Sequence, residues 1–490
     1  MTNTSERWIP RGRAWFARRF LPLGLGLQIA TSVGPAWAHE PAPAARQLLA
    51  ENSPGGRLWM RAPYGILTSE DGAKTWDWIC EPAVGYTGGQ DHRLAATLDG
   101  NVFVAADQGL FATSDHGCAW HAIQSIGNVS VLDVAVESDG RHVLALAQIP
   151  EADHYSLVAY RSDAQSEHFS ALGDPISDDL LGETLQPAPS DPSRIYVTGT
   201  VLSFAAASDA GSAPGDVSAV LLRSRDAGKT WQRVPIPGAS SENPPFLAAV
   251  HPTNPDIVYV RVKGESRSTG TIESSLLYTE DAGDNWTEIF SAPADILGFS
   301  LSEDGSEVLV GLGDSQDPSG ERAVDPNALG IYRATAPSFS FTQVRSGHVG
   351  CLTRTASGLF VCGNQASNEF ELAVSQDDGA TVSSVLKLGD VRGPLDCKNA
   401  PTVCDRQWPN ACASLGSCVA SPGGAVADGA VPSPAADNGC GCKLVGSSRG
   451  VKRGAWAELI ASAAVVFVFF RRRKSAMGGS SGPSARLLGG

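Results

Sequence analysis

The sequence predicts an all-β fold, a seven-bladed β-propeller built from four-stranded antiparallel blades. Three observations predict it: a short motif that recurs, strand-like runs before each copy, and nearly regular spacing between copies. A motif that returns at a period of about 20–50 residues indicates a repeat architecture. The five copies occupy residues 69–76, 113–120, 224–231, 279–286 and 375–382.

The spacing of the motif sets the number of blades. Asp71 and Asp115 stand 44 residues apart, and Asp226 and Asp281 stand 55 apart. The two remaining intervals, of 111 and 96 residues, are about twice as long, so we expect one degenerate copy in each. These copies fall at residues 160–169 and 331–341. The total of seven units lies within the range of about 4–8 blades seen in propellers.

Each copy of the motif is expected to be a turn between two strands. Short β-branched and aromatic runs, such as residues 101–105 and 256–260, precede the motifs and are bounded by Gly, Asp, Asn or Pro. Within the motif, Gly supplies a positive φ, and the Asp and Ser or Thr side chains bond nearby backbone N–H groups. The Trp then begins the return strand. No long helical period occurs between residues 40 and 395.

The repeat resembles the Asp-box, or BNR, motif, Ser/Thr-x-Asp-x-Gly-x-x-Trp, of sialidases, sortilin-type receptors, photosystem II assembly factors and several glycoside hydrolase propellers. The resemblance covers roughly residues 55–390; the first copy has Ala73 in place of Gly, and the last has Val382 in place of Trp. It implies a sialidase-like propeller in which the boxes are structural hairpins distant from the substrate site. The box residues are Ser69, Asp71, Trp76, Thr113, Asp115, Gly117, Trp120, Ser224, Asp226, Gly228, Trp231, Thr279, Asp281, Gly283, Trp286, Ser375, Asp377 and Gly379.

The N-terminus resembles a secretory signal. Residues 1–38 contain five arginines, an apolar stretch at residues 20–33, and the small-x-small site Ala36-Trp37-Ala38. We expect export, by either the general secretory or the twin-arginine route. The propeller is then predicted to occupy residues 39–395.

The C-terminal region is predicted to be an anchor. A Cys-rich segment at residues 396–418 precedes a flexible Ala/Pro/Gly linker at 419–439. Residues 440–474 resemble the myxobacterial C-terminal sorting tail, which implies processing near the cysteines and delivery to the cell surface or outer membrane. Residues 475–490 are expected to be disordered. The tail comprises Cys440 and Cys442, a hydrophobic transmembrane helix at 456–470, and Arg471, Arg472 and Arg473.

Cysteine usage agrees with an oxidising compartment. Cys351 and Cys362 are equidistant from a turn and predict a cross-strand disulfide. Cys80 and Cys118 follow neighbouring copies of the motif and are expected to pair between blades. For the remaining four we favour two disulfides over a zinc site, with connectivity open. These are Cys397, Cys404, Cys412 and Cys418.

The charge of the chain limits its partners. Its two ends hold 14 of the 37 basic residues but only 2 of the 52 acidic ones, so residues 39–442 carry a net charge of −27. An acidic surface of this size argues against nucleic acid and anionic lipid as ligands. We expect a monomer that contacts the membrane only through its tail and has no cofactor or metal. Asp-rich loops at residues 302–305 and 314–317 could offer oxygen ligands to Ca²⁺, although solvated turns are the preferred interpretation.

No catalytic residue can be nominated from the sequence. A sialidase-like enzyme needs three arginines, a Tyr–Glu pair and an acid, and residues 194–196 share only two letters with the Arg-Ile-Pro signature of that family. The leading hypothesis is a non-catalytic binding or scaffold module for an extracellular protein or glycan. The alternatives are a glycoside hydrolase of sialidase-like fold and an assembly factor. An enzyme should show a central pocket with convergent carboxylates opposite the boxes.

Overall fold

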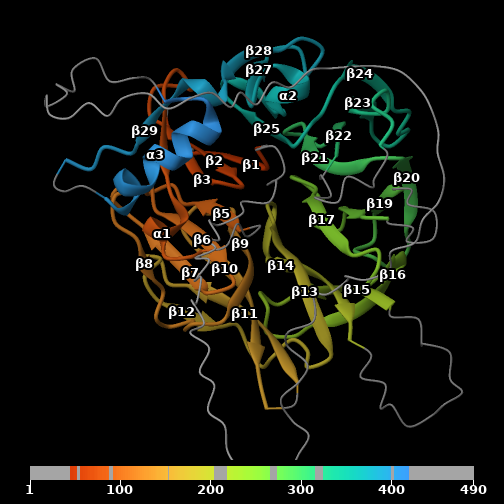
Figure 1. The fold of residues 1–490 in the computed structure, drawn as a ribbon. Helices are drawn as coiled ribbons and strands as arrows, with labels where there is room; N and C mark the ends of the chain where they lie inside the picture. Colours follow the sequence, from red (N-terminus) through yellow and green to blue (C-terminus); the bar gives the residue numbers. More distant parts are fainter. Residues whose placement is uncertain are drawn as a thin grey trace, which may run out of the picture. The chain divides into compact units, whose positions relative to one another are not determined.

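The computed structural model describes residues 45–418, except 52–55, 88–91, 153, 203–217, 265–272, 315–323 and 399–401. The predicted signal, linker and sorting tail lie outside the described residues. Within them the chain forms seven antiparallel sheets in sequence order (Figure 1), so the predicted seven-bladed propeller is confirmed. No helix among the residues described here has the length and apolar character that a membrane crossing needs.

The sheets are regular meanders of four strands. The first three comprise β1 (Gln47–Ala50), β2 (Leu58–Ala62), β3 (Gly65–Ser69) and β4 (Trp76–Ile79); β5 (Arg93–Ala96), β6 (Val102–Ala106), β7 (Gly109–Thr113) and β8 (His121–Ala122); and β9 (Ser130–Val136), β10 (Val143–Pro150), β11 (Tyr155–Ser162) and β12 (Phe169–Ala171).

The fourth and fifth sheets comprise β13 (Leu180–Ala188), β14 (Asp191–Val201), β15 (Ser218–Ser224) and β16 (Gln232–Ser240); and β17 (Pro245–Val250), β18 (Val258–Val262), β19 (Ser274–Thr279) and β20 (Thr287–Ala292). The sixth and seventh comprise β21 (Asp295–Leu301), β22 (Glu307–Gly313), β23 (Gly330–Thr335) and β24 (Thr342–Ser346); and β25 (Cys351–Thr355), β26 (Gly358–Cys362), β27 (Leu372–Ser375) and β28 (Ser383–Leu386). Short helices α1 (Glu81–Val84), α2 (Gln365–Asn368) and η1 (Leu388–Asp390) lie in connections.

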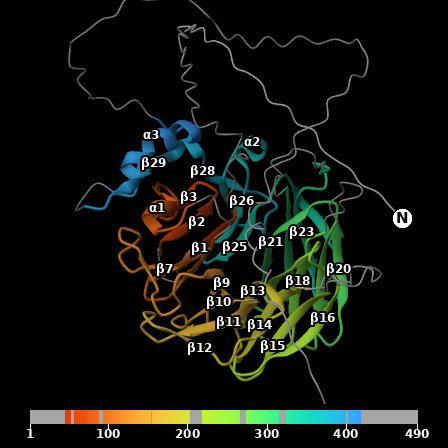
Figure 2. The ribbon, with the colours of Figure 1, turned by 60° about the horizontal axis from the view of Figure 1, so that its bottom comes forward.

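The first strand of every sheet lies innermost, at the central channel. Each of these strands contacts the first strand of the next sheet, and β25 contacts β1, which closes the ring (Figure 2). Because every sheet is an antiparallel meander, all seven innermost strands run in the same direction. We call the end where they begin the mouth face, and the end that carries the turns between third and fourth strands the turn face.

The degenerate copies of the motif lie where the spacing predicted them. In the third sheet, the Asp163 carboxylate accepts a hydrogen bond from the Glu167 N–H at 3.0 Å, and Ser166 has a φ of 60°. In the sixth sheet, the turn between β23 and β24 contains Phe339 with a φ of 47°. Both turns therefore connect the third and fourth strands without a complete motif.

The hydrophobic core is divided among the interfaces between neighbouring sheets. One cluster joins Leu144 and Leu157 of the third sheet to Ile195 and Val220 of the fourth, and all four side chains are buried. Strands buried on both faces need apolar residues at consecutive positions, which explains continuous runs such as that of β6. The ring is therefore stabilised by seven similar interfaces instead of one central core.

Side chains also join the innermost strands to one another. The Asp133 carboxylate of β9 accepts a hydrogen bond from the Leu185 N–H of β13 at 2.8 Å. The Thr184 hydroxyl of β13 accepts one from the Leu247 N–H of β17, also at 2.8 Å. Such bonds satisfy backbone groups that face the channel and fix each blade relative to the next.

The C-terminal segment closes the ring on its outside. Strand β29 (Val391–Pro394) pairs in parallel with β4, so the first sheet has five strands, and the blue segment lies beside the red first sheet in Figure 1. The Arg392 guanidinium donates to the Asp77 carboxylate through Nε at 2.9 Å. Helix α3 (Val403–Leu415) follows, and its Trp408 packs on Trp78 with ring centroids 5.6 Å apart.

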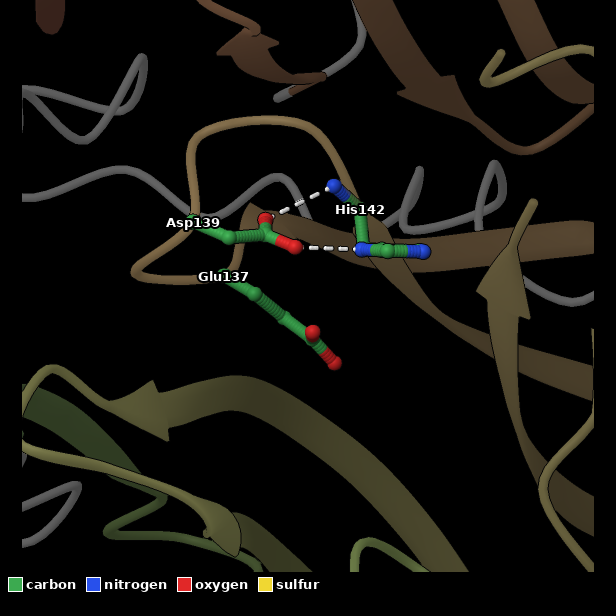
Figure 3. A group of neighbouring side chains, drawn as sticks. All are labelled: Glu137, Asp139 and His142. Carbon is green, nitrogen blue, oxygen red and sulfur yellow. Dashed lines mark hydrogen bonds and ion pairs between the residues drawn. The ribbon is translucent and has the colours of Figure 1, made fainter. Parts of the chain in front are cut away.

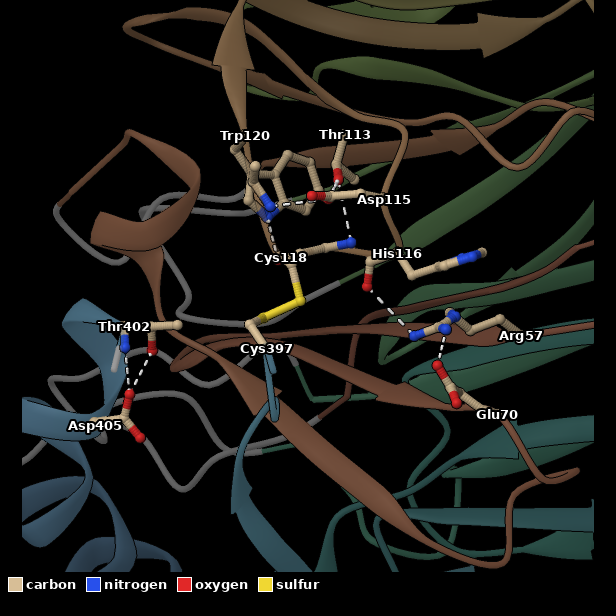
Figure 4. Close-up of a disulfide and its surroundings, with 12 residues drawn as sticks. Arg57, Glu70, Thr113, Asp115, His116, Cys118, Trp120, Cys397, Thr402 and Asp405 are labelled. Carbon is tan, nitrogen blue, oxygen red and sulfur yellow. Dashed lines mark hydrogen bonds and ion pairs between the residues drawn. A yellow bond between two sulfur atoms is a disulfide. The ribbon is translucent and has the colours of Figure 1, made fainter. Parts of the chain in front are cut away.

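The disulfides correct two sequence predictions, the pairing of Cys80 with Cys118 and the two disulfides expected within the Cys-rich segment. Cys80 and Cys118 do not pair with each other: Cys80 is joined to Cys404, and Cys118 is joined to Cys397 (Figure 4). The prediction failed because β29 runs along β4 and brings the C-terminal cysteines to the first two blades. Of the expected pairs within the Cys-rich segment, only Cys412–Cys418 forms. The structure also joins Cys351 and Cys362, which are directly paired across β25 and β26.

Candidate functional site

A pocket of about 130 Å³ opens at the mouth face. It lies on the side of the ring opposite the aspartate turns, the five connections between third and fourth strands that carry the motif (residues 69–76, 113–120, 224–231, 279–286 and 375–382). Arg46 precedes β1, Arg93 begins β5, and Asp295 begins β21. The fifth sheet contributes residues from the ends of three strands. The full lining is Arg46, Arg93, Phe246, Arg261, Val262, Lys263, Ser274, Asp295, Ile296 and Leu297.

The pocket lies across the mouth of the central channel. Arg46 and Arg93 come from the first two blades, whereas Phe246, Arg261 and Lys263 come from the fifth. In a ring of seven, the first and second blades stand across the axis from the fifth. Side chains from both sides therefore meet over the channel, at the place where propellers can offer convergent groups to a ligand.

Arg261 is held in place by its neighbours. It pairs across β17 and β18 with Phe246, and its guanidinium lies 5.4 Å from the centroid of that ring. Its Nη1 donates to the carbonyl oxygens of Ile296 at 2.7 Å and Leu297 at 3.2 Å. These contacts join the fifth and sixth blades and fix the orientation of the guanidinium beside the pocket.

Ser274 and Asp295 supply the buried polar groups of the lining. Both residues are 2% exposed. The Ser274 hydroxyl has no hydrogen-bond partner in the part of the chain that the structure describes. A buried hydroxyl without a partner costs free energy, about 1–3 kcal/mol, so this oxygen is available to a bound group or an ordered water.

Two carboxyl groups lie on innermost strands near this pocket. Glu183 is the extra residue of a β-bulge, because the register of β13 against β14 shifts between Gly182 and Thr184. Burial raises the pKa of Glu183 to about 7, and the charge of Arg93 opposes the rise. Burial also raises the pKa of Asp133, against the opposing charge of Arg93. Arg93 therefore interacts with two carboxyl groups and also lines the pocket.

The predicted motif residues form a common set of turns. In all five, the Ser or Thr hydroxyl donates to the Asp carboxylate at 2.8–3.0 Å and accepts from the backbone N–H four residues later. The Asp carboxylate accepts from a further N–H at 2.8–2.9 Å. Hydrogen bonds from the Thr230 hydroxyl and N–H lower the pKa of Asp226 to about 2. These aspartates are thus engaged in the turns.

The motif glycines and tryptophans contact the preceding blade. A Cβ added to Gly117 would lie 2.7 Å from the Ile79 side chain, and one added to Gly228 would lie 2.5 Å from Leu172. The Trp286 indole donates to the Pro235 carbonyl at 3.1 Å. In the first motif, Ala73 takes the glycine position with a φ of 69°. The motif therefore serves packing between blades.

Among the described residues, one group of side chains has the geometry to hold a metal ion. Glu137, Asp139 and His142 lie at the turn between β9 and β10, with ligand atoms within 4.8 Å of one another (Figure 3). Arg161 already binds both oxygens of Glu137, at 2.8 and 2.7 Å. The Asp139 carboxylate accepts from the His142 ring and from two backbone N–H groups. Protein groups thus satisfy the acidic members of this group.

The pocket residues were missed by sequence reasoning. Arg46, Arg93, Arg261 and Lys263 belong to no common motif and are up to 217 residues apart. Their only local signal is position, since each lies at the mouth end of a strand. Arg194, which begins the segment that shares two letters with the sialidase signature, lies on β14, the second strand of the fourth sheet. It contacts Asp256 and Tyr196 and does not line the pocket.

Comparison with known proteins shows similarity at the level of structure alone. No family model matches the chain, and no curated protein matches it. Similar solved structures include an ancestral GH74 enzyme, with a TM-score of 0.49 and 12% identity over 70% of this chain and 46% of that one. The Niastella koreensis GH74 enzyme has a TM-score of 0.30 and 12% identity, over 69% of this chain and 62% of that one. The GH93 α-L-arabinofuranosidase of Fusarium graminearum has a TM-score of 0.39 and 13% identity, over 62% of this chain and 96% of that one.

The chain spans less than two thirds of the length of both GH74 structures. At identities of 12–13% the likeness concerns fold and carries no activity to this chain.

Proposed function

We propose that this chain is an exported propeller, anchored at the cell surface by its C-terminal tail, that acts as a non-catalytic binding module for an extracellular protein or glycan. The ligand site is the pocket at the mouth face. We further propose that the repeats belong to the Asp-box class and the tail to the myxobacterial sorting class. The chain acts as a monomer and needs no cofactor.

The observation that carries the proposal is the composition of the pocket. Among its described lining residues, four are cationic and one, Asp295, is a carboxylate. Glycosidases commonly use two carboxyl groups that flank the scissile bond, about 5–9.5 Å apart. A rigid scaffold that brings cations together without a second acidic group in the lining is suited to binding. The aspartate turns lie at the other face and are occupied by structural hydrogen bonds.

The test is a ligand screen with a variant that fills the pocket. The purified protein is applied to arrays of glycans and extracellular proteins, and each hit is measured again with Lys263→Trp. Lys263 lies at the pocket and is only partly buried, so the indole should block the site while the fold is kept. The control is Lys229→Trp, at an exposed position of an aspartate turn. We expect at least about tenfold weaker binding for the first variant and no change for the second. Equal binding by both variants contradicts the assignment.

A second candidate, a glycoside hydrolase, is favoured by Glu183. A carboxyl group with a pKa of about 7 has the value that a general acid needs near neutral pH. The discriminating assay is hydrolysis of a panel of fluorogenic glycosides. Turnover that disappears in Glu183→Gln and persists in Glu303→Gln, at an exposed position, would establish the enzyme and overturn the non-catalytic proposal. Absence of turnover across the panel supports the binding module.

A further inference from the structure

We infer that the pocket recognises an isolated anionic substituent, a carboxylate or a sulfate, carried on an otherwise neutral glycan. The inference rests on the proposed function, because it names the class of ligand that the same pocket binds. It follows from three features of the lining: its charge, the way its cations are held, and its buried hydroxyl.

The charge of the pocket is opposite to that of the protein. Residues 39–442 carry a net charge of −27, yet the described pocket lining holds Arg46, Arg93, Arg261 and Lys263 against Asp295. Basic residues are scarce in this chain, so four of them around one small pocket stand out from the surrounding surface. A concave site with an excess of one sign of charge focuses the field on a ligand of the opposite sign.

Two of the four cations interact with neighbouring protein groups. Arg261 is oriented by two carbonyl oxygens and by the face of Phe246. Arg93 belongs to the rigid innermost strand β5 and interacts electrostatically with Asp133 and Glu183 beneath the mouth. A guanidinium held in one orientation loses little entropy when it binds a planar carboxylate or a sulfate through paired N–H groups. The arrangement thus favours an oxyanion over a diffuse negative surface.

The neutral part of the lining fits the rest of such a ligand. The buried Ser274 hydroxyl, which has no partner among described residues, can donate to the anion or to a sugar hydroxyl. Phe246, Ile296 and Leu297 give an apolar wall for the C–H surface of a sugar ring.

A volume of about 130 Å³ admits one small charged group. Polyanions would bring further negative charges against the acidic surface outside the pocket. This favours a sparsely charged glycan over an acidic peptide.

The experiment compares matched probes by isothermal titration calorimetry with the full-length protein. One probe set is a neutral oligosaccharide with a single uronate, the same oligosaccharide with a single sulfate ester, and the same chain with neither. An acidic peptide of similar length is the fourth probe. We expect an anionic probe to bind at least about tenfold more tightly than its neutral counterpart. This is the gain in affinity that one charge-assisted hydrogen bond predicts. The uronate and sulfate arms identify which anion is preferred.

Two variants locate the effect. Lys263→Gln removes a charge from a partly exposed lining residue, and Ser274→Ala removes the buried hydroxyl; each should weaken the anionic probe about threefold to tenfold. Lys229→Gln removes one charge from the exposed turn and should change nothing. Lys263→Gln provides the decisive result if Ser274→Ala folds poorly.

The outcomes separate the two proposals. Equal binding of neutral and anionic glycans, abolished by Lys263→Trp, overturns the ligand class and leaves the binding module standing. Preference for the acidic peptide overturns the glycan assignment. Binding of no probe, or anionic binding unaffected by Lys263→Gln, overturns this inference.

Discussion

Replacement of Glu371 by Gln should stabilise the protein at alkaline pH and have little effect in acid. Glu371 is fully buried beside α2, and its Oε1 accepts from the Gln365 N–H at 2.9 Å. Its Oε2 has no partner among described residues. Burial raises the pKa of this carboxyl group to about 7, against the opposing backbone hydrogen bonds of Gln365 and Ala45. The folded protein therefore holds the proton more tightly than the unfolded chain does.

The sign of the effect follows from this difference. Below pH 4.5 the group is protonated in both states, and its burial carries no charge penalty. As the pH rises from 4.5 to 7, the unfolded chain releases the proton first, and folding stability falls. Above pH 7 the full difference between the unfolded pKa of 4.5 and the folded pKa of about 7 acts on the protein. It lowers the free energy of unfolding by about 3 kcal/mol. A glutamine side chain keeps the acceptor for the Gln365 N–H and has no such pH dependence.

The assay is chemical unfolding of the wild type and Glu371→Gln between pH 4 and pH 8.5, with disulfides intact. The difference in unfolding free energy between them isolates Glu371, because Glu183 and all other groups are common to both proteins. We expect that difference to move in favour of the variant by about 3 kcal/mol as the pH rises from 4.5 to 8. Glu303→Gln, at an exposed position, is the matched control. A difference that stays constant across this pH range would refute the reasoning.

Two further predictions concern the turns and the ring closure. Ser224→Ala leaves the buried Gly228 N–H without its acceptor, and we expect a loss of about 1–3 kcal/mol in unfolding free energy; a loss no larger than that of an exposed serine in β12 would contradict the role of the turn. Removal of the Cys118–Cys397 disulfide, by serine at both positions, should cost about 4 kcal/mol, since with the other long-range disulfide intact it closes a loop of about 45 residues. An unchanged denaturation midpoint under non-reducing conditions would show that β29 closes the ring without it.

The blade count could be predicted because its determinants are local. A turn such as residues 224–231 places a hydroxyl, a carboxylate and a glycine within a few residues of the backbone groups that they bond. The same bonds can form wherever the short pattern occurs, so the pattern is readable without knowledge of the rest of the chain. The cross-strand pairing of Cys351 with Cys362 is equally local, because the hairpin between them is short.

The candidate site could not be predicted, because it depends on how the ring closes. The pocket brings Arg46 beside residues that follow it by about 200 positions, and no short pattern encodes that proximity. Glu183 is set apart by a bulge in β13, and the extra residue of a bulge looks like any other in a strand. The pairing of Cys80 with Cys404 could not be predicted either, because the two cysteines are 324 residues apart and come together only when the ring closes.

The sequence alone thus determined the repeated unit: short strands, hydrogen-bonded turns and their number, each stabilised by contacts within a few tens of residues. Tertiary structure decided which segments distant in sequence lie together. The parallel addition of β29 to β4 joins residues 76 and 391, and it places two disulfides between the C-terminal segment and the first two blades. Closure of the ring also brings the first, second, fifth and sixth blades around one channel mouth, where cations distant in sequence come together. Local hydrogen bonding leaves a readable pattern, whereas proximity across a ring arises only when every blade has packed against the next.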